Sequence, residues 1–223
     1  MKETLPRVHE LFDCTCTIAS PLFRRDSYPW ELLDDISTFI RDYGPTLDPA
    51  RFEHRSGHVY IARTASVAPT AYIGDYTIID EHAEIRHGAY IRCSAVIGKH
   101  AVVGNSCELK NCILFDEVQV PHFNYVGDSI LGYKSHTGAG AITSNVKSDK
   151  TLVTVKTENG VIETGLKKFG AMLGDFVEVG CNSVLNPGSV VGRNTSIYPL
   201  SFVRGYVSAN RIYKRLGEVA KKV

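Results

Sequence analysis

The sequence predicts an all-β protein built as a parallel β-helix, with partly helical segments at its two ends and one protruding β-hairpin. Three observations support this: aliphatic residues spaced six apart, a small residue four places after most of them, and an Asn159-Gly160 turn signal between two repeat blocks. A period of six fits neither a helix of about 3.6 residues per turn nor a lone strand of period two. The chain must therefore turn a corner every six residues, and three corners close a coil of about eighteen.

The six-residue repeat runs through two blocks of the chain. Its aliphatic positions are Ile61, Val67, Ile73, Ile79, Ile85, Ile91, Ile97, Val103 and Leu109, then Leu173, Val179, Leu185, Val191, Ile197 and Val203. We expect these side chains to point into a narrow interior, with the small residues at the corners, where space is tightest. Glycine often follows the aliphatic residue, as at Gly74, Gly98, Gly104, Gly174, Gly180 and Gly192. We expect these glycines to supply tight backbone geometry at the turns.

The segments outside the repeat have different patterns. Residues 1–57 are predicted to form a partly helical cap, because Tyr28–Tyr43 places apolar residues on one helical stripe before Gly44-Pro45. Residues 58–206 form the β-helix, with a hairpin excursion at about 148–168 around Asn159-Gly160. Residues 207–223 are predicted to be an amphipathic helix closing the other end, with Ile212, Leu216 and Val219 on one face.

The composition excludes several classes of function. Lysine and arginine total 25 and aspartate and glutamate total 24, so no net charge favours nucleic acid or an anionic membrane. The N-terminal residues lack the apolar run of a secretory signal, and no window approaches the roughly 18 apolar residues of a membrane span. We expect a cytoplasmic protein whose six cysteines are reduced thiols, with Cys107 as a small buried repeat residue.

Two cations occupy equivalent repeat positions on successive coils. Arg92 and Lys110 are eighteen residues apart, so they are expected to stack on one face of the coil. Their mutual repulsion would be relieved by an anion between them, which favours a phosphate site. The alternative is that both are solvated surface groups.

Beyond Leu109 the repeat loosens, and two motifs follow. The first motif, V-P-H-F-N-Y-V-G-D at 120–128, contains His122, Phe123, Tyr125, Gly127 and Asp128. The second, H-T-G-A-G-A-I-T-S-N at 136–145, contains Gly138, Ala139, Gly140, Ile142, Thr143 and Asn145. With these motifs, about residues 58 to 206 resemble the acetyltransferase half of the bifunctional glucosamine-1-phosphate N-acetyltransferase and UDP-N-acetylglucosamine pyrophosphorylase. The excursion and its exit are more similar to archaeal sugar-1-phosphate nucleotidylyltransferases, and we expect no nucleotidyltransferase domain of the kind that those proteins carry.

The resemblance implies a left-handed β-helix and a direct attack of a sugar amine on the thioester of acetyl-CoA. It implies that His122 is the general base, which suits a histidine with a reference pKa near 6.5. Arg92 and Lys110 stand where the family binds phosphate, and Tyr125 and Asn145 where it positions the sugar. Backbone N–H groups around Gly138 to Gly140 are expected to hold the oxyanion, because small residues let the backbone approach closely.

Several positions differ from the family. His136 replaces a substrate-contacting asparagine, and the lysine that follows the second motif is either Lys147 or Lys150. The resemblance places acetyl-CoA against Ala139, Gly140, Cys181 and Pro199, with Cys181 in place of a serine and Pro199 in place of a small residue. It also implies a homotrimer, with the second wall of the site coming from a neighbouring subunit. No tightly bound metal is expected.

Two other readings use the same scaffold. A γ-type carbonic anhydrase binds zinc through three histidines, and His82, His87 and His100 are the candidates, with His82 and His100 eighteen apart. The other reading is a non-catalytic scaffold or regulatory subunit related to the sugar nucleotidyltransferases. A zinc assay distinguishes the first from acyl transfer, and the absence of turnover would favour the second.

Overall fold

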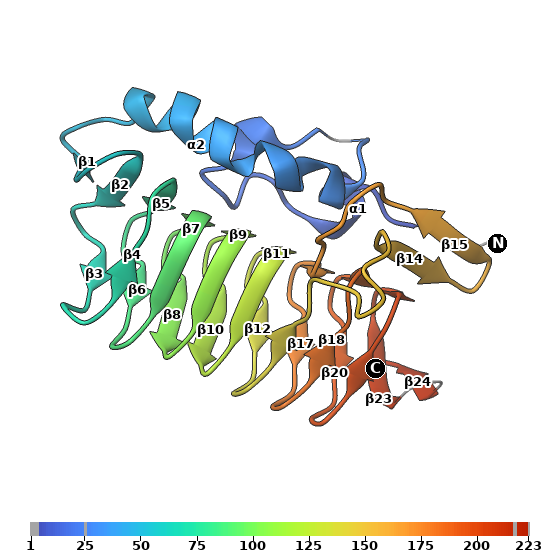
Figure 1. The fold of residues 1–223 in the computed structure, drawn as a ribbon. Coiled ribbons are helices and arrows are strands. Elements are labelled where there is room, and N and C mark those ends of the chain that lie inside the picture. Colours follow the sequence, from blue (N-terminus) through green and yellow to red (C-terminus); the bar gives the residue numbers. More distant parts are fainter. Residues whose placement is uncertain (1–4, 25, 216–217, 223) are drawn as a thin grey trace.

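The structure is a computed structural model, and it describes residues 5–24, 26–215 and 218–222. Its strands wind into a parallel β-helix, with the N-terminal segment lying along one side (Figure 1). The helical elements are α1 (Val8–Leu11), α2 (Ile36–Tyr43) and three 3-10 helices, η1 (Ser20–Leu22), η2 (Pro29–Asp35) and η3 (Gly44–Thr46). The predicted all-β parallel β-helix is therefore confirmed.

The strands of the first part of the solenoid are β1 (Phe52–His54), β2 (Val59–Ala62), β3 (Ser66–Val67), β4 (Tyr72–Ile73), β5 (Thr77–Ile79), β6 (Glu84–Ile85), β7 (Tyr90–Ile97), β8 (Val102–Asn105), β9 (Glu108–Leu114), β10 (Gln119–His122), β11 (Tyr125–Leu131), β12 (His136–Thr137) and β13 (Ile142–Thr143). The arm consists of β14 (Thr154–Thr157) and β15 (Gly160–Glu163). The remaining strands are β16 (Ala171–Leu173), β17 (Glu178–Val179), β18 (Val184–Leu185), β19 (Ser189–Val191), β20 (Ser196–Ile197), β21 (Phe202–Val203), β22 (Tyr206–Val207), β23 (Arg211–Arg215) and β24 (Glu218–Lys221).

Backbone pairing between successive coils builds two long sheets. One contains β2, β5, β7, β9, β11, β13, β18 and β21, and the other contains β3, β6, β8, β10, β12, β17, β20 and β23. The coil step is 18 residues where Ile79 opposes Ile97, and 17 residues where Ile97 opposes Leu114 and Leu114 opposes Leu131. The loosened repeat beyond Leu109 is therefore a run of coils shortened by one residue.

The aliphatic repeat residues point inward, as predicted. Ile79, Ile97, Leu114, Leu131, Leu173 and Val191 oppose one another in successive coils and are fully buried. Burial of one such side chain contributes roughly 1.5–3 kcal/mol, so this ladder is a main source of the solenoid's stability.

The glycines after the aliphatic residues have a different role from the one predicted. A Cβ on Gly104 would lie 1.5 Å from the carbonyl oxygen of Pro121, and one on Gly180 would lie 2.3 Å from the nitrogen of Pro199. Glycine is therefore needed because the next coil approaches closely. Non-glycine residues with positive φ form the corners instead, including His82, His100, Glu117, Lys134, Phe176 and Asn194 at one of them.

The N-terminal segment covers a side of the solenoid as well as its beginning. η2 packs against β11, and α2 packs against β7 and β9, so the helical elements lie across several coils (Figure 1). The predicted apolar stripe is buried through Leu32, Leu33, Ile36 and Ile40. Its first half is a 3-10 helix that begins at Pro29, and only the second half is α-helical.

One buried carboxylate attaches the N-terminal segment to the solenoid. Asp175 accepts hydrogen bonds from the N–H groups of Asp13 and Tyr133, and it pairs with Arg193 at 2.8 Å. The N–H of Asp175 in turn donates to the carbonyl of Leu11. Burial raises the pKa of Asp175, which these three donors counteract, so the carboxylate holds two distant segments together.

The predicted hairpin excursion is confirmed, because β14 and β15 pair antiparallel with Thr157 opposite Gly160. The predicted C-terminal amphipathic helix is wrong. Within the described residues this segment forms strands β23 and β24, with Ile212 and Val219 on them, and Leu216 lies outside the described residues. Ser196 and Ile197 offer an open sheet edge to β23, and backbone pairing with that edge outweighs the helical pattern.

Candidate active site

The candidate site begins at one corner of the solenoid. Four predicted residues occupy the same corner position on successive coils, namely His122, Ala139, Cys181 and Pro199. Three inter-coil hydrogen bonds set this register, from Gly140 N to His122 O (3.0 Å), Asn182 N to Ala139 O (2.8 Å) and Leu200 N to Cys181 O (2.9 Å). We call these four residues the corner ladder. The structure thus aligns the predicted base with three predicted cofactor positions.

His122 is held at the corner by its backbone. It ends β10, its N–H donates to Oδ1 of Asn124 at 3.0 Å, and Phe123 after it has a positive φ of 51°. Asn124 is buried and donates from Nδ2 to the carbonyls of Gly138 and Ala141. The His122 side chain is exposed, and its imidazole makes no hydrogen bond within the described part of the chain. A fixed backbone therefore carries a ring that is free to contact a ligand.

Two of the three N–H groups predicted to hold an oxyanion are already used. Gly138 donates to Val179 O at 2.7 Å, and Gly140 donates to His122 O at 3.0 Å. The prediction that Gly138 and Gly140 hold the oxyanion is therefore wrong, because both N–H groups donate to carbonyls of neighbouring coils. The N–H of Ala139 has no acceptor among residues 5–24, 26–215 and 218–222. Ala139 is thus the available donor in the coil after His122.

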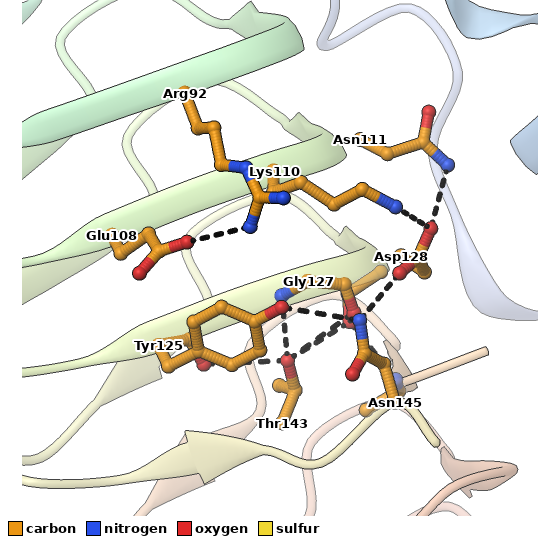
Figure 2. Close-up of polar contacts among 11 residues, drawn as sticks. Arg92, Glu108, Lys110, Asn111, Tyr125, Gly127, Asp128, Thr143 and Asn145 are labelled. Atoms are coloured by element: carbon orange, nitrogen blue, oxygen red, sulfur yellow. Dashed lines mark hydrogen bonds and ion pairs between the residues drawn. The ribbon is translucent and has the colours of Figure 1, made fainter. Parts of the chain in front are cut away.

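The two predicted phosphate-binding cations each face a carboxylate. Arg92 Nη1 lies 3.3 Å from Glu108 Oε1, and Lys110 Nζ lies 2.7 Å from Asp128 Oδ1 (Figure 2). Lys110 opposes Cys93, because the register shifts between Ile91 and Cys93. The predicted direct stacking of Arg92 on Lys110 is therefore wrong by one residue, and a bulge is the cause.

Asp128 is the centre of a polar network on this face. It accepts from Lys110 and from Nδ2 of Asn111 through Oδ1, and from Nδ2 of Asn145 through Oδ2 at 2.5 Å (Figure 2). The Asn145 amide also donates to the Tyr125 hydroxyl at 3.1 Å. Four predicted residues, Arg92, Lys110, Tyr125 and Asn145, are thus brought to one surface.

Tyr125 lies across a glycine. A Cβ on Gly127 would be 2.5 Å from the Tyr125 hydroxyl oxygen, so the ring needs the missing side chain. Burial raises the pKa of the Tyr125 phenol, which therefore stays protonated at neutral pH and can donate a hydrogen bond.

Two predicted substrate residues lie outside this network. His136, on β12 beside Gln119, pairs through Nδ1 with Glu178 Oε2 at 2.8 Å. Lys150 is exposed near the start of the excursion, and its side chain has no partner in the described ranges. The alternative Lys147 pairs with Asp149 at 3.5 Å.

The histidines considered for zinc do not converge. The rings of His82 and His100 stack with centroids 4.9 Å apart, as their spacing predicts, whereas His87 bonds Thr70 at 2.7 Å. Among the described residues no group of three or more His, Cys, Asp or Glu side chains could hold a metal ion. None of the helices in the described part of the chain has the length and apolar character needed to cross a membrane.

Sequence reasoning missed the partners that complete the site, namely Glu108, Asn111 and Asn124, and it gave Asp128 no role. The sequence did carry a signal for the corner that Asn111 and Asp128 share. Asn111 and Asp128 both have positive φ at one corner, and Asn and Asp are the residue types that tolerate this geometry. All six cysteines are free, as predicted, and Cys107 is buried with Sγ near Val120 O.

The fold and its corner motifs define a hexapeptide-repeat, left-handed parallel β-helix protein. Residues 75–207 match the family model described as the GMPPB C-terminal domain, and the chain belongs to this family.

Named relatives agree with this assignment. The chain is 29% identical over 192 residues to a bifunctional sugar-1-phosphate nucleotidylyltransferase/acetyltransferase of Sulfurisphaera tokodaii, covering 83% of this chain and 47% of that protein. It is 39% identical over 93 residues to the bifunctional protein GlmU of Methanococcus vannielii, covering 42% of this chain and 22% of that protein. The chain thus spans less than half the length of these two relatives.

Among solved structures, the chain is similar to a mutant of perosamine N-acetyltransferase from Caulobacter crescentus in complex with CoA and GDP-perosamine. The identity is 16%, the TM-score is 0.35, and the match covers 74% of this chain and 56% of that one.

Proposed function

We propose that this protein transfers an acetyl group from acetyl-CoA to the amine of an amino-sugar phosphate resembling glucosamine-1-phosphate. The observation that supports this most is the corner ladder, in which the exposed His122 imidazole lies one coil from the unused N–H of Ala139. A base and an oxyanion donor in adjacent coils are what acyl transfer to an amine requires. The names of two relatives, one an acetyltransferase and one GlmU, add to this support.

In the proposed reaction His122 removes a proton from the sugar ammonium, and the free amine attacks the thioester carbonyl. The Ala139 N–H donates to the oxyanion that forms, the attacking nitrogen loses its second proton, and the C–S bond breaks, so that CoA leaves as a thiol carrying that proton. Acetyl-CoA lies along Ala139, Gly140, Cys181 and Pro199 in this proposal, as a cosubstrate, and no tightly bound metal takes part.

We assign the sugar phosphate to the face beside the corner ladder. Arg92, Lys110, Tyr125 and Asn145 are the proposed contacts, and His136 and Lys150 are the proposed outer ones. Because Glu108 and Asp128 already pair with the two cations, phosphate would have to share these cations or displace their carboxylates.

We further propose a cytoplasmic homotrimer whose site is completed by a neighbouring subunit. Exposed apolar side chains recur on one outward line of the coils, where Tyr72 opposes Tyr90 and, beyond Glu108 and Tyr125, Ile142 follows. Exposed apolar lines of this kind are typical of protein interfaces. No nucleic acid or membrane partner is proposed.

The test is acetyl-CoA-dependent thiol release with glucosamine-1-phosphate and related amino-sugar phosphates. His122→Ala should lower the rate at least ~100-fold, which is the usual contribution of a general base. His100→Ala is the matched control, because His100 is also an exposed corner histidine but lies at another corner. Equal rates for both variants would overturn the role of His122. No turnover by the parent protein with any of these substrates would favour the scaffold or regulatory subunit instead.

A further inference from the structure

A polar cavity lies where the arm meets the solenoid. Its volume is about 330 Å³, and its lining includes Lys156 of β14, Arg204 after β21, and Lys147 and Asp149 at the start of the excursion. Lys147 lies 3.5 Å from Asp149, whose carboxylate also accepts from the N–H and hydroxyl of Thr151. Neither Lys156 nor Arg204 has an ion pair or side-chain hydrogen bond with any described residue. The cavity therefore carries two cations without a carboxylate partner.

The two cations are brought together by backbone contacts. A Cβ on Gly205 would lie 2.5 Å from the carbonyl oxygen of Lys156, and Gly205 has a φ of 78°. The strand of the arm thus lies directly against the residue that follows Arg204. Because the backbone holds two like charges at one cavity, an anion between them would relieve their repulsion.

Arg204 also ends the line of outward positions that begins at Lys110. Successive coils place Gly127, Ser144 and Asn186 between these two residues, in a register set by the neighbouring pairs. Four steps of about 4.8 Å separate Lys110 from Arg204, or roughly 19 Å. The cavity therefore lies well apart from the phosphate site proposed at Arg92 and Lys110.

The lining includes an aromatic platform. Phe202 is 50% exposed and lies on β21 two residues before Arg204, so both side chains lie on the outer surface. Ser144, Ser148 and Thr154 add hydroxyl groups to the same cavity. Cations for phosphate, an aromatic face for a base and hydroxyls for a ribose together match the chemistry of a nucleotide.

We propose that this cavity binds a nucleotide, with Arg204 and Lys156 on its phosphate oxygens and Phe202 against its base. Two sources carry this chemistry, namely the 3′-phosphoadenosine diphosphate end of a CoA thioester and the nucleoside diphosphate of a sugar nucleotide. With a CoA thioester as the ligand the proposal rests on the proposed acetyl transfer, and with a sugar nucleotide it goes beyond it. Neither form depends on His122.

Isothermal titration calorimetry on the full chain tests the proposal with CoA, 3′-dephospho-CoA, UDP and GDP. We expect the double variant Lys156→Gln/Arg204→Gln to bind the cognate nucleotide at least tenfold more weakly than the parent. Loss of CoA binding, with weaker binding of 3′-dephospho-CoA to the parent, identifies a CoA thioester. Loss of UDP or GDP binding identifies a sugar nucleotide. Phe202→Leu should weaken the binding of the same ligand by a smaller factor.

Two controls keep the outcome interpretable. Lys168→Gln removes an exposed cation of the excursion that does not line the cavity. This variant should bind nucleotides as tightly as the parent does. His122→Ala should keep nucleotide binding even where it abolishes turnover, so failure of the catalytic proposal is separable from failure of this one. The proposal is overturned if no nucleotide binds the parent. It is also overturned if the double variant, with an unchanged circular dichroism spectrum, binds nucleotides as the parent does.

Discussion

Two pairs of cations on one outer surface of the solenoid differ in what surrounds them. Arg92 and Lys110, in the middle coils, each have a carboxylate within ion-pair distance, whereas Lys156 and Arg204, at the arm, have none among the described residues. Lys110 of the first pair belongs to the folded framework, since its partner Asp128 is only 4% exposed and also accepts from two asparagines. The second pair is held together by backbone contacts alone.

This difference shows that a cation's position does not reveal its function. A compensated cation also stabilises the fold, and a ligand has to compete with its carboxylate, whereas an uncompensated cation attracts an anion directly. The predictions below test whether the first pair is coupled to stability and the second pair is not.

The largest expected effect is on stability at the compensated pair. Asp128→Ala leaves Lys110 half buried without a partner and removes the acceptor of Asn111 and Asn145, so the free energy of unfolding should fall by about 3 kcal/mol. Urea denaturation measures this. Asp149→Ala at the arm, where the carboxylate is exposed, should leave the free energy of unfolding nearly unchanged. Similar losses for the two variants would contradict the distinction.

Salt should separate the two pairs in a second way. Nucleotide binding at Lys156 and Arg204 is expected to weaken roughly tenfold between 50 and 500 mM NaCl, because exposed charges are strongly screened. The stability difference between the parent and Asp128→Ala should stay nearly constant over the same range, because its charges are mostly buried. Calorimetric titrations and urea denaturation at several salt concentrations measure both. Salt-independent nucleotide binding would mean that the cations of the arm do not contact phosphate.

A smaller effect is expected from pH at the arm. Hydrogen bonds from Thr151 lower the pKa of Asp149 below its ordinary value of 3.8. Its contribution to stability is therefore present above its unfolded pKa and lost only as the pH falls through the lower folded value. Asp149 should therefore stay ionised between pH 5 and 7.5, and the ionisation expected in this range is the second one of a phosphate monoester, with a pKa near 6. Uridine monophosphate should bind roughly threefold more tightly at pH 7.5 than at pH 5. Tighter binding at pH 5 would indicate a titrating protein group instead.

The smallest effect is expected at the exposed half of the compensated pair. Glu108→Gln removes the partner of Arg92, whose side chain is 51% exposed, and surface pairs of this kind contribute little to stability. A double-mutant cycle with Arg92→Gln, read by thermal unfolding, gives the coupling between the two side chains. A coupling as large as that of Lys110 with Asp128 would place Arg92 in the framework together with Lys110.

Much of the scaffold was predictable because its signals are local. The inward aliphatic ladder and the Asn159-Gly160 hairpin both follow from short-range patterns, and both are present. The C-terminal strands were not predictable, because β23 forms by pairing with β20, a partner that no local pattern reveals. The position of the N-terminal segment along the coils depends on distant contacts of the same kind, such as Asp13 with Asp175.

The candidate site divides in the same way. The family resemblance pointed to His122, Ala139, Cys181 and Pro199, which share one corner, and to Arg92, Lys110, Tyr125 and Asn145, which share one face. Spacing could not show that the N–H groups of Gly138 and Gly140 donate to carbonyls of neighbouring coils. A coil of 17 residues and one of 18 place different carbonyl groups opposite a given N–H.

The sequence by itself determined that this chain winds into coils of about eighteen residues, because a six-residue period fits neither a helix nor a lone strand. The tertiary structure alone decided which cations are compensated. Charge compensation depends on distances of a few ångströms between side chains on different coils, and a single bulge or a docked arm changes those distances without changing the repeat.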